Sequence, residues 1–224
     1  MTMKLAIFAA TGGIGRHLLA QAAAAGHEVT AVVRRPDALP PVPARVVAAD
    51  LATADPATLA DALAGADAIL SGLGARGKKD AGVAWRGTTA IASAMRASGV
   101  RRVVVVSAAP IGQVPSPGRP RPPRHDPGDG FFTRFLLSPG IRTVLRAHYA
   151  DLARMEEVLR DSDLDWTVVR PPRLTDGPST TAYRTALDQN LRGGVSISRA
   201  DVAHCMLGAL DEPHTIRHTI GVAD

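Results

Sequence analysis

The sequence predicts an α/β fold, in which helices cover both faces of a doubly wound parallel β-sheet. Short apolar segments alternate along the chain with longer helical patterns, and most connections between them are short. One apolar segment is a run of valines, Val103–Val106, which is typical of a parallel strand covered on both faces. This alternation indicates repeated strand–helix–strand units. A chain of 224 residues can bury one sizeable core, so we expect a single domain over residues 1–224.

The amino-terminal segment predicts the first such unit. A strand over Leu5–Phe8 leads into a small, glycine-bearing turn, and an alanine-rich helix over Arg16–Ala25 follows. A second apolar strand over Val29–Val33 ends at the paired Arg34 and Arg35. Open parallel sheets that bind nucleotides are built from this order of strand, turn, helix and strand, so we expect a Rossmann-type sheet.

The following segments continue the alternation after a proline-rich loop. Pro56 stands at a first helical position, where the missing N–H of proline costs nothing. Gly99 stands where the next long helix should stop, as glycine commonly does. The predicted elements are a strand over Ala44–Ala49, a helix from Pro56 to about Ala64, a strand over Asp67–Ser71, a helix over Ala81–Ser98 and the valine strand.

An insertion rich in proline and arginine, at about residues 112–146, interrupts this rhythm. Loops of that length inside a compact domain are usually functional or disordered. The insertion contains an apolar patch, Phe131–Leu137. Two interpretations stand equally: a mobile flap over the strand ends that covers a substrate or partner, or a partly disordered insertion whose short helix packs on the core.

The carboxyl-terminal part resumes the pattern. Its first helix is amphipathic, with Leu152, Met155, Val158 and Leu159 on one side. The predicted elements are a helix over Tyr149–Asp161, a strand over Trp166–Val169, a short extended segment over Val195–Ile197, a helix over Asp201–Leu210 and an edge strand over Thr219–Val222.

The turn after the first strand has the composition of a phosphate-binding loop. Gly12 and Gly15 occupy the second and third glycine positions of a Gly-x-x-Gly-x-x-Gly pattern, and Ala9 replaces the first. A loop with few side chains lets the backbone approach a pyrophosphate, and the following helix offers unpaired N–H groups to the anion. Alanine at position 9 is compatible with this function if its φ is negative. We therefore predict that this unit binds a dinucleotide.

The paired arginines indicate which dinucleotide. Where an NAD-binding unit usually carries an acidic residue for the ribose hydroxyl, this chain offers Arg34 with Arg35 beside it. A guanidinium instead favours the 2′-phosphate of NADP(H). Since ligands of such sheets lie at the carboxyl ends of the strands, Asp50 and Ser107 become further candidates.

Composition and charge argue against several other classes of protein. The net charge is +5, but the basic excess is local and aromatic residues are scarce, so we expect no nucleic-acid partner. No apolar run is long enough for a membrane helix, and the histidines show no metal-ligand spacing. The first strand begins by Lys4, which leaves no room for a signal peptide, and Cys205 is the only cysteine. We therefore expect a soluble cytoplasmic protein without a metal.

Several motifs together give a resemblance to a known family. They are AIFAATGGIG, EVTAVVRR, VVAADL, LSGLGARG, VVVVSA, RMEEVLRDSDLDWTVVRPPRLTDGP, TAYR and SISRADVAHCML. From Lys4 to Val222 the chain resembles the atypical short-chain dehydrogenases/reductases with NmrA-like or NAD(P)H-binding domains. Within these it is most similar to the biliverdin reductase B or NADPH-dependent flavin reductase type.

The resemblance implies an NADP(H) site and assigns residues to it. The arginine pair would bind the 2′-phosphate, and Pro171 and Pro172 would wall the nicotinamide pocket. The implied cofactor-binding residues are Thr11, Gly12, Gly13, Ile14, Gly15, Arg34, Arg35, Asp50, Leu51, Gly72, Leu73, Gly74, Arg76, Ser107, Ala108, Pro171 and Pro172.

The chain lacks the Tyr-x-x-x-Lys pair with which many short-chain dehydrogenases protonate an alkoxide, because Ala153 stands four residues after Tyr149. A flavin, quinone or tetrapyrrole-like acceptor needs that acid less, since its conjugated rings spread the transferred charge. We therefore expect an NADPH-dependent oxidoreductase with two catalytic residues, Ser107 as hydrogen-bond donor and Arg173 facing the developing anion. Arg173 replaces a histidine of the resembling type, and a surface ion pair with Asp176 is its alternative role.

A second function stays open, that of an NADP(H)-binding redox sensor of the NmrA-like type without turnover. The missing tyrosine–lysine pair and the insertion are compatible with it. For either function we expect a monomer or homodimer. Cys205 is expected to be inert core, and Asp201 to start its helix.

Overall fold

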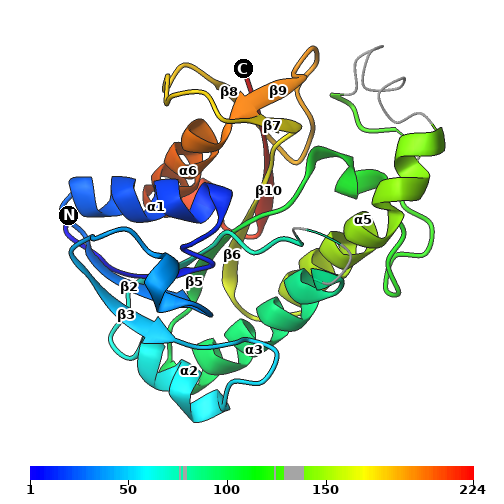
Figure 1. Ribbon diagram of the computed structural model, residues 1–224. Coiled ribbons are helices and arrows are strands. Elements are labelled where there is room, and N and C mark those ends of the chain that lie inside the picture. The colour runs from blue at the N-terminus through cyan, green and yellow to red at the C-terminus, as the bar shows by residue number, and fades with distance from the viewer. Residues whose placement is uncertain (76, 78–79, 124, 129–138) are drawn as a thin grey trace.

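The computed structural model places an eight-stranded sheet between two layers of helices (Figure 1). It describes residues 1–75, 77, 80–123, 125–128 and 139–224. The strands of this sheet are β1 (Lys4–Phe8), β2 (Glu28–Val33), β3 (Ala44–Ala48), β4 (Ala68–Ser71), β5 (Arg102–Val106), β6 (Asp165–Arg170), β8 (Arg184–Leu187) and β10 (His218–Ala223).

The strand order β3-β2-β1-β4-β5-β6-β10-β8 confirms the doubly wound topology predicted from the sequence. Every neighbouring pair is parallel except β8, which runs antiparallel to β10. The chain leaves β1 toward β3 and later crosses back to start again at β4, so the order reverses between β1 and β4. In sheets of this kind, ligands bind outside the carboxyl ends of the strands at that reversal.

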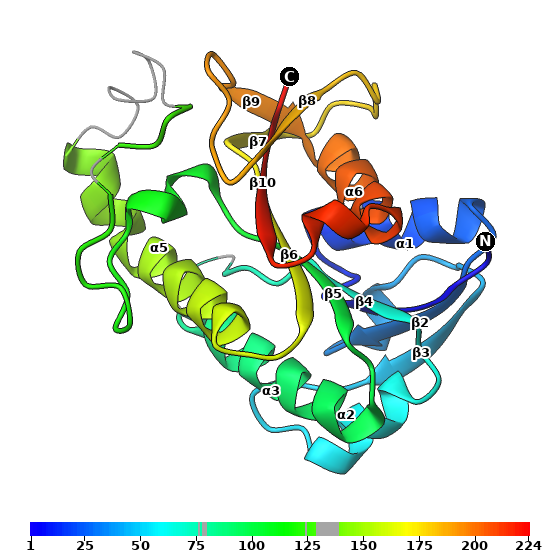
Figure 2. The ribbon, with the colours of Figure 1, turned by 180° about the vertical axis from the view of Figure 1, so that it is seen from behind.

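Helices of opposite faces bury alternate residues of the same strands. α1 (Gly13–Ala24) and α6 (Arg199–Gly208) pack on one face, while α2 (Pro56–Leu63), α3 (Val83–Ser98) and α5 (Pro139–Arg160) cover the other (Figures 1 and 2). In β1, Leu5 and Ile7 belong to the α1 side, and Ala6 and Phe8 belong to the α3 side. This two-sided burial explains why the central strands are almost purely apolar.

The sequence signals for the start of α2 and the end of α3 are confirmed. Pro56 is the first residue of α2, and the Asp55 carboxylate caps this helix by accepting a hydrogen bond from the Thr58 N–H at 3.3 Å. Gly99 follows α3 with a φ of 79°, a left-handed conformation that glycine adopts without steric cost.

One prediction about the carboxyl-terminal strands was wrong, and one strand was not predicted. The strand expected at the edge, β10, lies between β6 and β8 and is interior. The edge is β8, which the sequence did not indicate because its residues are mostly exposed and carry no apolar alternation. The structure also adds a separate two-stranded parallel sheet formed by β7 (Arg173–Thr175) and β9 (Ser196–Ser198).

The insertion is partly helical. α5 begins at Pro139, ten residues before the predicted start at Tyr149, so it includes the last part of the 112–146 segment. The described part before it contains a short 3-10 helix, η3 (Ala109–Gln113), and a tight turn in which Ser116 and Arg119 pair. The apolar patch Phe131–Leu137 lies outside the described residues, so the flap interpretation stays a prediction.

Candidate cofactor-binding site

The turn after β1 is sharper than the sequence suggested. Ala9 has a φ of +57°, so the negative φ on which the tolerance of alanine at this position was predicted to depend is not adopted. The reason is local: the chain must reverse direction so that the Gly12 N–H donates to the Ala9 carbonyl at 2.7 Å, and α1 then starts directly after Gly12. An alanine therefore takes the conformation that the missing glycine would have taken.

Gly15 is required by close packing. A methyl group built on Gly15 would lie 2.1 Å from the carbonyl oxygen of Ala9, which is far inside van der Waals contact. Gly72, after β4, is packed less tightly, since its added methyl would lie 3.3 Å from the Gly15 nitrogen. Backbone from β1, α1 and β4 thus meets without side chains between, which forms the kind of cradle that a pyrophosphate needs.

The amino terminus of α1 opens onto a cleft between the ends of the strands. No side chain of the described chain caps this helix at Gly12, and its first turn holds no acidic residue. The cleft holds about 730 Å³ of empty space when the open solvent at its mouth is counted. Its lining residues are Ala9, Thr11, Gly12, Val32, Val33, Arg34, Arg35, Ala49, Asp50, Leu51, Gly72, Leu73, Gly74, Asp80 and Val83.

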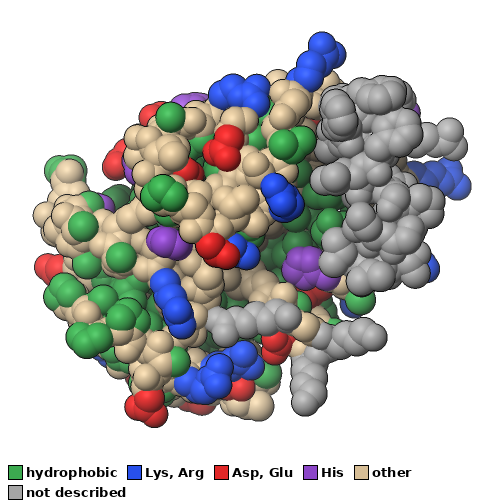
Figure 3. All heavy atoms as spheres, turned by 45° about the horizontal axis from the view of Figure 1, so that its top comes forward, with side chains coloured by type: hydrophobic (Ala, Val, Ile, Leu, Met, Phe, Trp, Pro, Cys, Tyr) green, Lys and Arg blue, Asp and Glu red, His purple; other side chains and the backbone are tan. Residues whose placement is uncertain are grey.

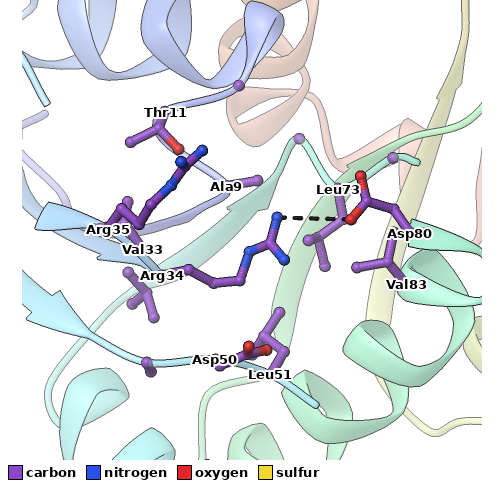
Figure 4. Close-up of a pocket in the computed structure, with 15 residues that line it drawn as sticks. Ala9, Thr11, Val33, Arg34, Arg35, Asp50, Leu51, Leu73, Asp80 and Val83 are labelled. Atoms are coloured by element: carbon purple, nitrogen blue, oxygen red, sulfur yellow. Dashed lines mark ion pairs between the residues drawn. The ribbon is translucent and has the colours of Figure 1, made fainter. Parts of the chain in front are cut away.

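Both arginines predicted to bind the cofactor lie in this cleft. Figure 4 shows Arg34 extending across it toward Asp80, while Arg35 turns toward Thr11 of the phosphate loop. The Arg34 guanidinium lies 3.8 Å from the Asp80 carboxylate, and its side chain is 53% exposed. Asp80 is a lining residue that the sequence did not single out. It places a negative charge near the guanidinium that we expect to meet a phosphate.

The remaining predicted residues fall into three groups. Gly13, Ile14 and Gly15 form the first turn of α1 behind the lining surface. Ser107, Ala108, Pro171 and Pro172 follow the carboxyl ends of β5 and β6, where the Ala109 N–H donates to the Pro171 carbonyl at 2.9 Å. Arg76 lies outside the described residues.

Ser107 takes part in a buried network that the sequence did not indicate. Its hydroxyl donates to Glu156 at 2.7 Å, and Arg170 donates twice to the same carboxylate, at 3.0 and 2.5 Å. Glu156 and Arg170 are almost completely buried. Burial opposes the charge of Arg170, but the field of Glu156 and the hydrogen bonds between them outweigh it and raise the Arg170 pKa. The sequence did contain a sign of this buried network, because Glu156 is a charged residue on the apolar side of its helix, between Leu152 and Leu159.

Arg199, at the start of α6, is a second residue that the sequence did not single out. A methyl group built on Gly13 would lie 2.8 Å from the Cδ and Nε atoms of Arg199, so this side chain packs against the first turn of α1. Its guanidinium also forms an ion pair with Asp176 at 2.6 Å. Asp176 is thus engaged by Arg199, whereas Arg173, its predicted alternative partner, is an exposed residue that begins β7.

The structure also tests the predictions made for Tyr149, Cys205 and Asp201. Burial raises the pKa of Tyr149, so this phenol is a poor proton donor as well as lacking its lysine. Burial also raises the pKa of the Cys205 thiol to about 12, as expected for inert core. Asp201 does not start α6; Ser198 caps that helix, accepting from the Asp201 N–H.

The donor set fits a dinucleotide and offers little to a metal. Among the described residues, no group of three or more histidine, cysteine or carboxylate side chains could hold a metal ion. None of the helices in the described part is long and apolar enough to cross a membrane. On the face in Figure 3, the coloured basic and acidic side chains are interspersed.

Comparison with known proteins identifies the family. The NAD(P)H-binding family profile matches residues 9–213, and the chain belongs to this family. The protein UPF0659 C216.03 of Schizosaccharomyces pombe is 32% identical over 186 residues, which cover 77% of this chain and 72% of that protein. The cofactor class, NAD(P)H, is therefore as predicted.

Solved structures share the fold across the whole chain. A candidate exported protein of Burkholderia pseudomallei is 30% identical, with a TM-score of 0.77 and full coverage of both chains. SP1627 of Streptococcus pneumoniae, named as a candidate NADH-flavin reductase, is 25% identical with a TM-score of 0.74, covering 99% of each chain. ChuY of Escherichia coli O157:H7, an anaerobilin reductase, is 21% identical with a TM-score of 0.73, covering 97% of this chain and 96% of that one, and shows the fold alone.

Proposed function

We propose that this protein is an NADPH-dependent oxidoreductase that reduces a flavin, a quinone or a tetrapyrrole-like acceptor in the cytoplasm. The observation that carries the proposal is the cleft, which combines the open amino terminus of α1 with Arg34 and Arg35 at the end of β2. A helix terminus attracts the pyrophosphate, and guanidinium groups attract the additional phosphate of NADPH. The flavin reductase name of SP1627 supports the acceptor class.

Bound NADPH supplies the hydride, so the protein has to orient the acceptor and stabilise its developing charge. Ser107 was expected from the sequence to donate a hydrogen bond to the acceptor, but its hydroxyl donates to Glu156 at 2.7 Å. In this proposal the serine oxygen instead accepts a hydrogen bond from an N–H of the acceptor or cofactor. Arg173 is exposed at the start of β7 and carries the permanent positive charge. In this proposal Arg173 faces the anion that forms, and Ser107 fixes the orientation.

Single-turnover reduction tests the acceptor and both residues. The wild-type protein, R173A and S107A are each mixed with NADPH and FMN, or with a quinone, and loss of nicotinamide absorbance is followed. We expect R173A to slow hydride transfer by about tenfold or more, since it removes a charge-stabilising group, and S107A to have a smaller effect. Undiminished transfer in both variants would contradict these assignments.

Calorimetry tests the coenzyme preference. R34Q should weaken NADPH binding by roughly 10- to 100-fold while leaving NADH binding unchanged, because a charge-assisted contact to phosphate is lost. R45Q is the matched control, since Arg45 is exposed on β3 and lies outside the cleft. Equal affinity of the wild-type protein for both coenzymes would refute the role of Arg34.

The engagement of Ser107 by Glu156 favours a second candidate, an NADP(H)-binding redox sensor without turnover. If the hydroxyl and carboxylate serve only to stabilise the fold, the cleft would bind NADPH but pass no hydride. The same assay separates the two functions. Tight NADPH binding without reduction of any acceptor favours the sensor, and turnover favours the reductase.

A further inference from the structure

A second cavity lies on the α5 side of the sheet and shares no lining residue with the cofactor cleft. Its volume is about 350 Å³, and it lies open to solvent between β6, the start of β10, the end of α5 and the segment after β5. Figure 2 shows β6 and β10 side by side, with the green segment that follows β5 running past them toward α5. The volume is within the range of small-molecule sites, roughly 300–1,000 Å³.

Among the described residues, four arginines line this cavity: Arg119, Arg160, Arg170 and Arg217. Arg170 and Arg160 both form ion pairs with the Glu156 carboxylate, at 2.5 and 3.2 Å, so two positive charges share one negative charge. Burial lowers the pKa of Arg119, and the nearby charges of Arg160 and Arg170 lower it further. Positive charges therefore repel one another here, and an anion would relieve that repulsion.

The acidic residues of the cavity are already bound by donors. The Asp126 carboxylate accepts from the backbone N–H groups of Asn190, at 2.7 Å, and Gly128, at 2.9 Å. The Asp188 carboxylate pairs with His218 at 2.5 Å and accepts from the Thr219 N–H at 2.9 Å. These carboxylates keep their charge, so the four arginines of the described lining face three carboxylates, Glu156, Asp126 and Asp188, and one positive charge is in excess.

The backbone holds two lining residues in an unfavourable conformation. Asp188 has a φ of +56° and Arg217 a φ of +63°, a region that costs a non-glycine residue about 1–2 kcal/mol. The Arg217 N–H donates to the Trp166 carbonyl at 2.6 Å, and its guanidinium donates to the Asp163 carbonyl at 3.2 Å. Strained residues of this kind cluster where a ligand site needs a fixed geometry.

Arg119 is fixed as well. It ends the tight turn that starts at Ser116, with backbone hydrogen bonds of 2.9 and 3.2 Å between the two residues. The Gly118 N–H in this turn also donates to Glu157 of α5. Because both guanidinium-bearing segments are anchored, little order has to be gained when a ligand binds.

We propose that this cavity is a second binding site, which takes a small organic anion through its carboxylate or phosphate groups. Arg119 and Arg217 bind the anionic group. Trp166, together with the lining residues Pro123 and Pro127, provides an apolar wall for the body of the ligand. The site is separate from NADP(H) binding, so this inference does not depend on the proposed function.

Titration calorimetry with citrate and with inorganic phosphate, at low ionic strength, tests the site. We expect R119Q and R217Q each to weaken binding by about tenfold or more, because each removes a charged hydrogen-bond donor. R45Q, on the distant edge strand β3, should bind as the wild-type protein does. R34Q/R35Q should keep the citrate affinity that R119Q and R217Q lose, which separates this cavity from the cofactor cleft. Absence of millimolar binding, unchanged affinity in both cavity variants, or loss only in R34Q/R35Q would overturn the proposal.

Arginine modification in the wild-type protein gives an answer that does not depend on folding of the variants. Phenylglyoxal is added with and without citrate, and the modified arginines are identified by mass spectrometry. We expect citrate to protect Arg119 and Arg217 but not Arg45, which is exposed outside the cavity. Equal modification of Arg119 and Arg217 with and without citrate would count against the site.

Discussion

Ala9 shows how a single residue can carry strain inside a candidate phosphate-binding loop. Its φ of +57° is a left-handed backbone conformation that glycine adopts freely but that is strained for a residue with a methyl side chain. The conformation persists because the Gly12 N–H needs the Ala9 carbonyl, and because Gly15 packs directly against that carbonyl. The strain is thus a consequence of the turn that starts α1.

Ala9→Gly should therefore stabilise the protein. The substitution removes the cost of the left-handed conformation, about 1–2 kcal/mol. Glycine loses more conformational entropy than alanine on folding, which offsets roughly half of that gain, so we expect the free energy of unfolding to rise by about 0.5–1 kcal/mol. The free energy of unfolding is measured by urea denaturation. Ala10→Gly, at the next and fully buried position, should instead destabilise. A loss of similar size in both variants would show that Ala9 is not strained.

At the scale of elements, Asp201 joins α6 to the loop that precedes β8. Its carboxylate accepts hydrogen bonds from the Thr180 and Thr181 N–H groups at 2.9 and 2.8 Å, and from the Ser198 hydroxyl at 2.8 Å. Burial alone would raise the Asp201 pKa, but these hydrogen bonds outweigh it and hold the pKa below its ordinary value. The ionised form therefore stabilises the folded loop.

Asp201→Asn should remove part of the acid dependence of stability. A lowered pKa means that the contribution is complete above the unfolded pKa of about 3.9 and is lost as the pH falls through the lower folded value. At neutral pH we expect the free energy of unfolding of the variant to be about 1–3 kcal/mol below that of the wild-type protein. On acidification the free energy of unfolding should fall less in the variant than in the wild-type protein. Denaturant titrations at several pH values measure both. Asp61→Asn, exposed on α2, is the control, and an unchanged pH profile for Asp201→Asn would contradict the assignment.

For the whole molecule, cofactor binding should appear as thermal stability. The cleft is built from the ends of β1, β2, β3 and β4 and the start of α3, so a ligand there binds only the folded sheet. At a free concentration of about 100 times its Kd, NADPH adds about 2.7 kcal/mol. This corresponds to a rise in Tm of roughly 5–10 °C for a chain of this size.

Differential scanning fluorimetry measures this shift. NADH at the same concentration should raise the Tm less, and in R34Q the two coenzymes should give equal shifts. Failure of both coenzymes to raise the Tm would mean that the cleft does not bind them.

Local sequence signals were sufficient for every strand of the central sheet except β8, and for most of the cleft. Thr11, Gly12, Arg34 and Arg35 line it as expected, because a strand–turn–helix–strand unit brings its own ends together. The edge strand β8 and the partners of Ser107 were not predictable in this way. They depend on pairings between residues far apart in the sequence, which no local periodicity records.

The sequence by itself determined the alternating fold, the glycine-bearing loop and the arginine pair, since each is encoded within a few neighbouring residues. Only the tertiary structure decided that Ala9 adopts a positive φ, that Arg199 lies against the phosphate loop, and that four arginines of the described residues line a second cavity. The physical reason is that strain, charge clustering and burial arise from the packing of distant segments.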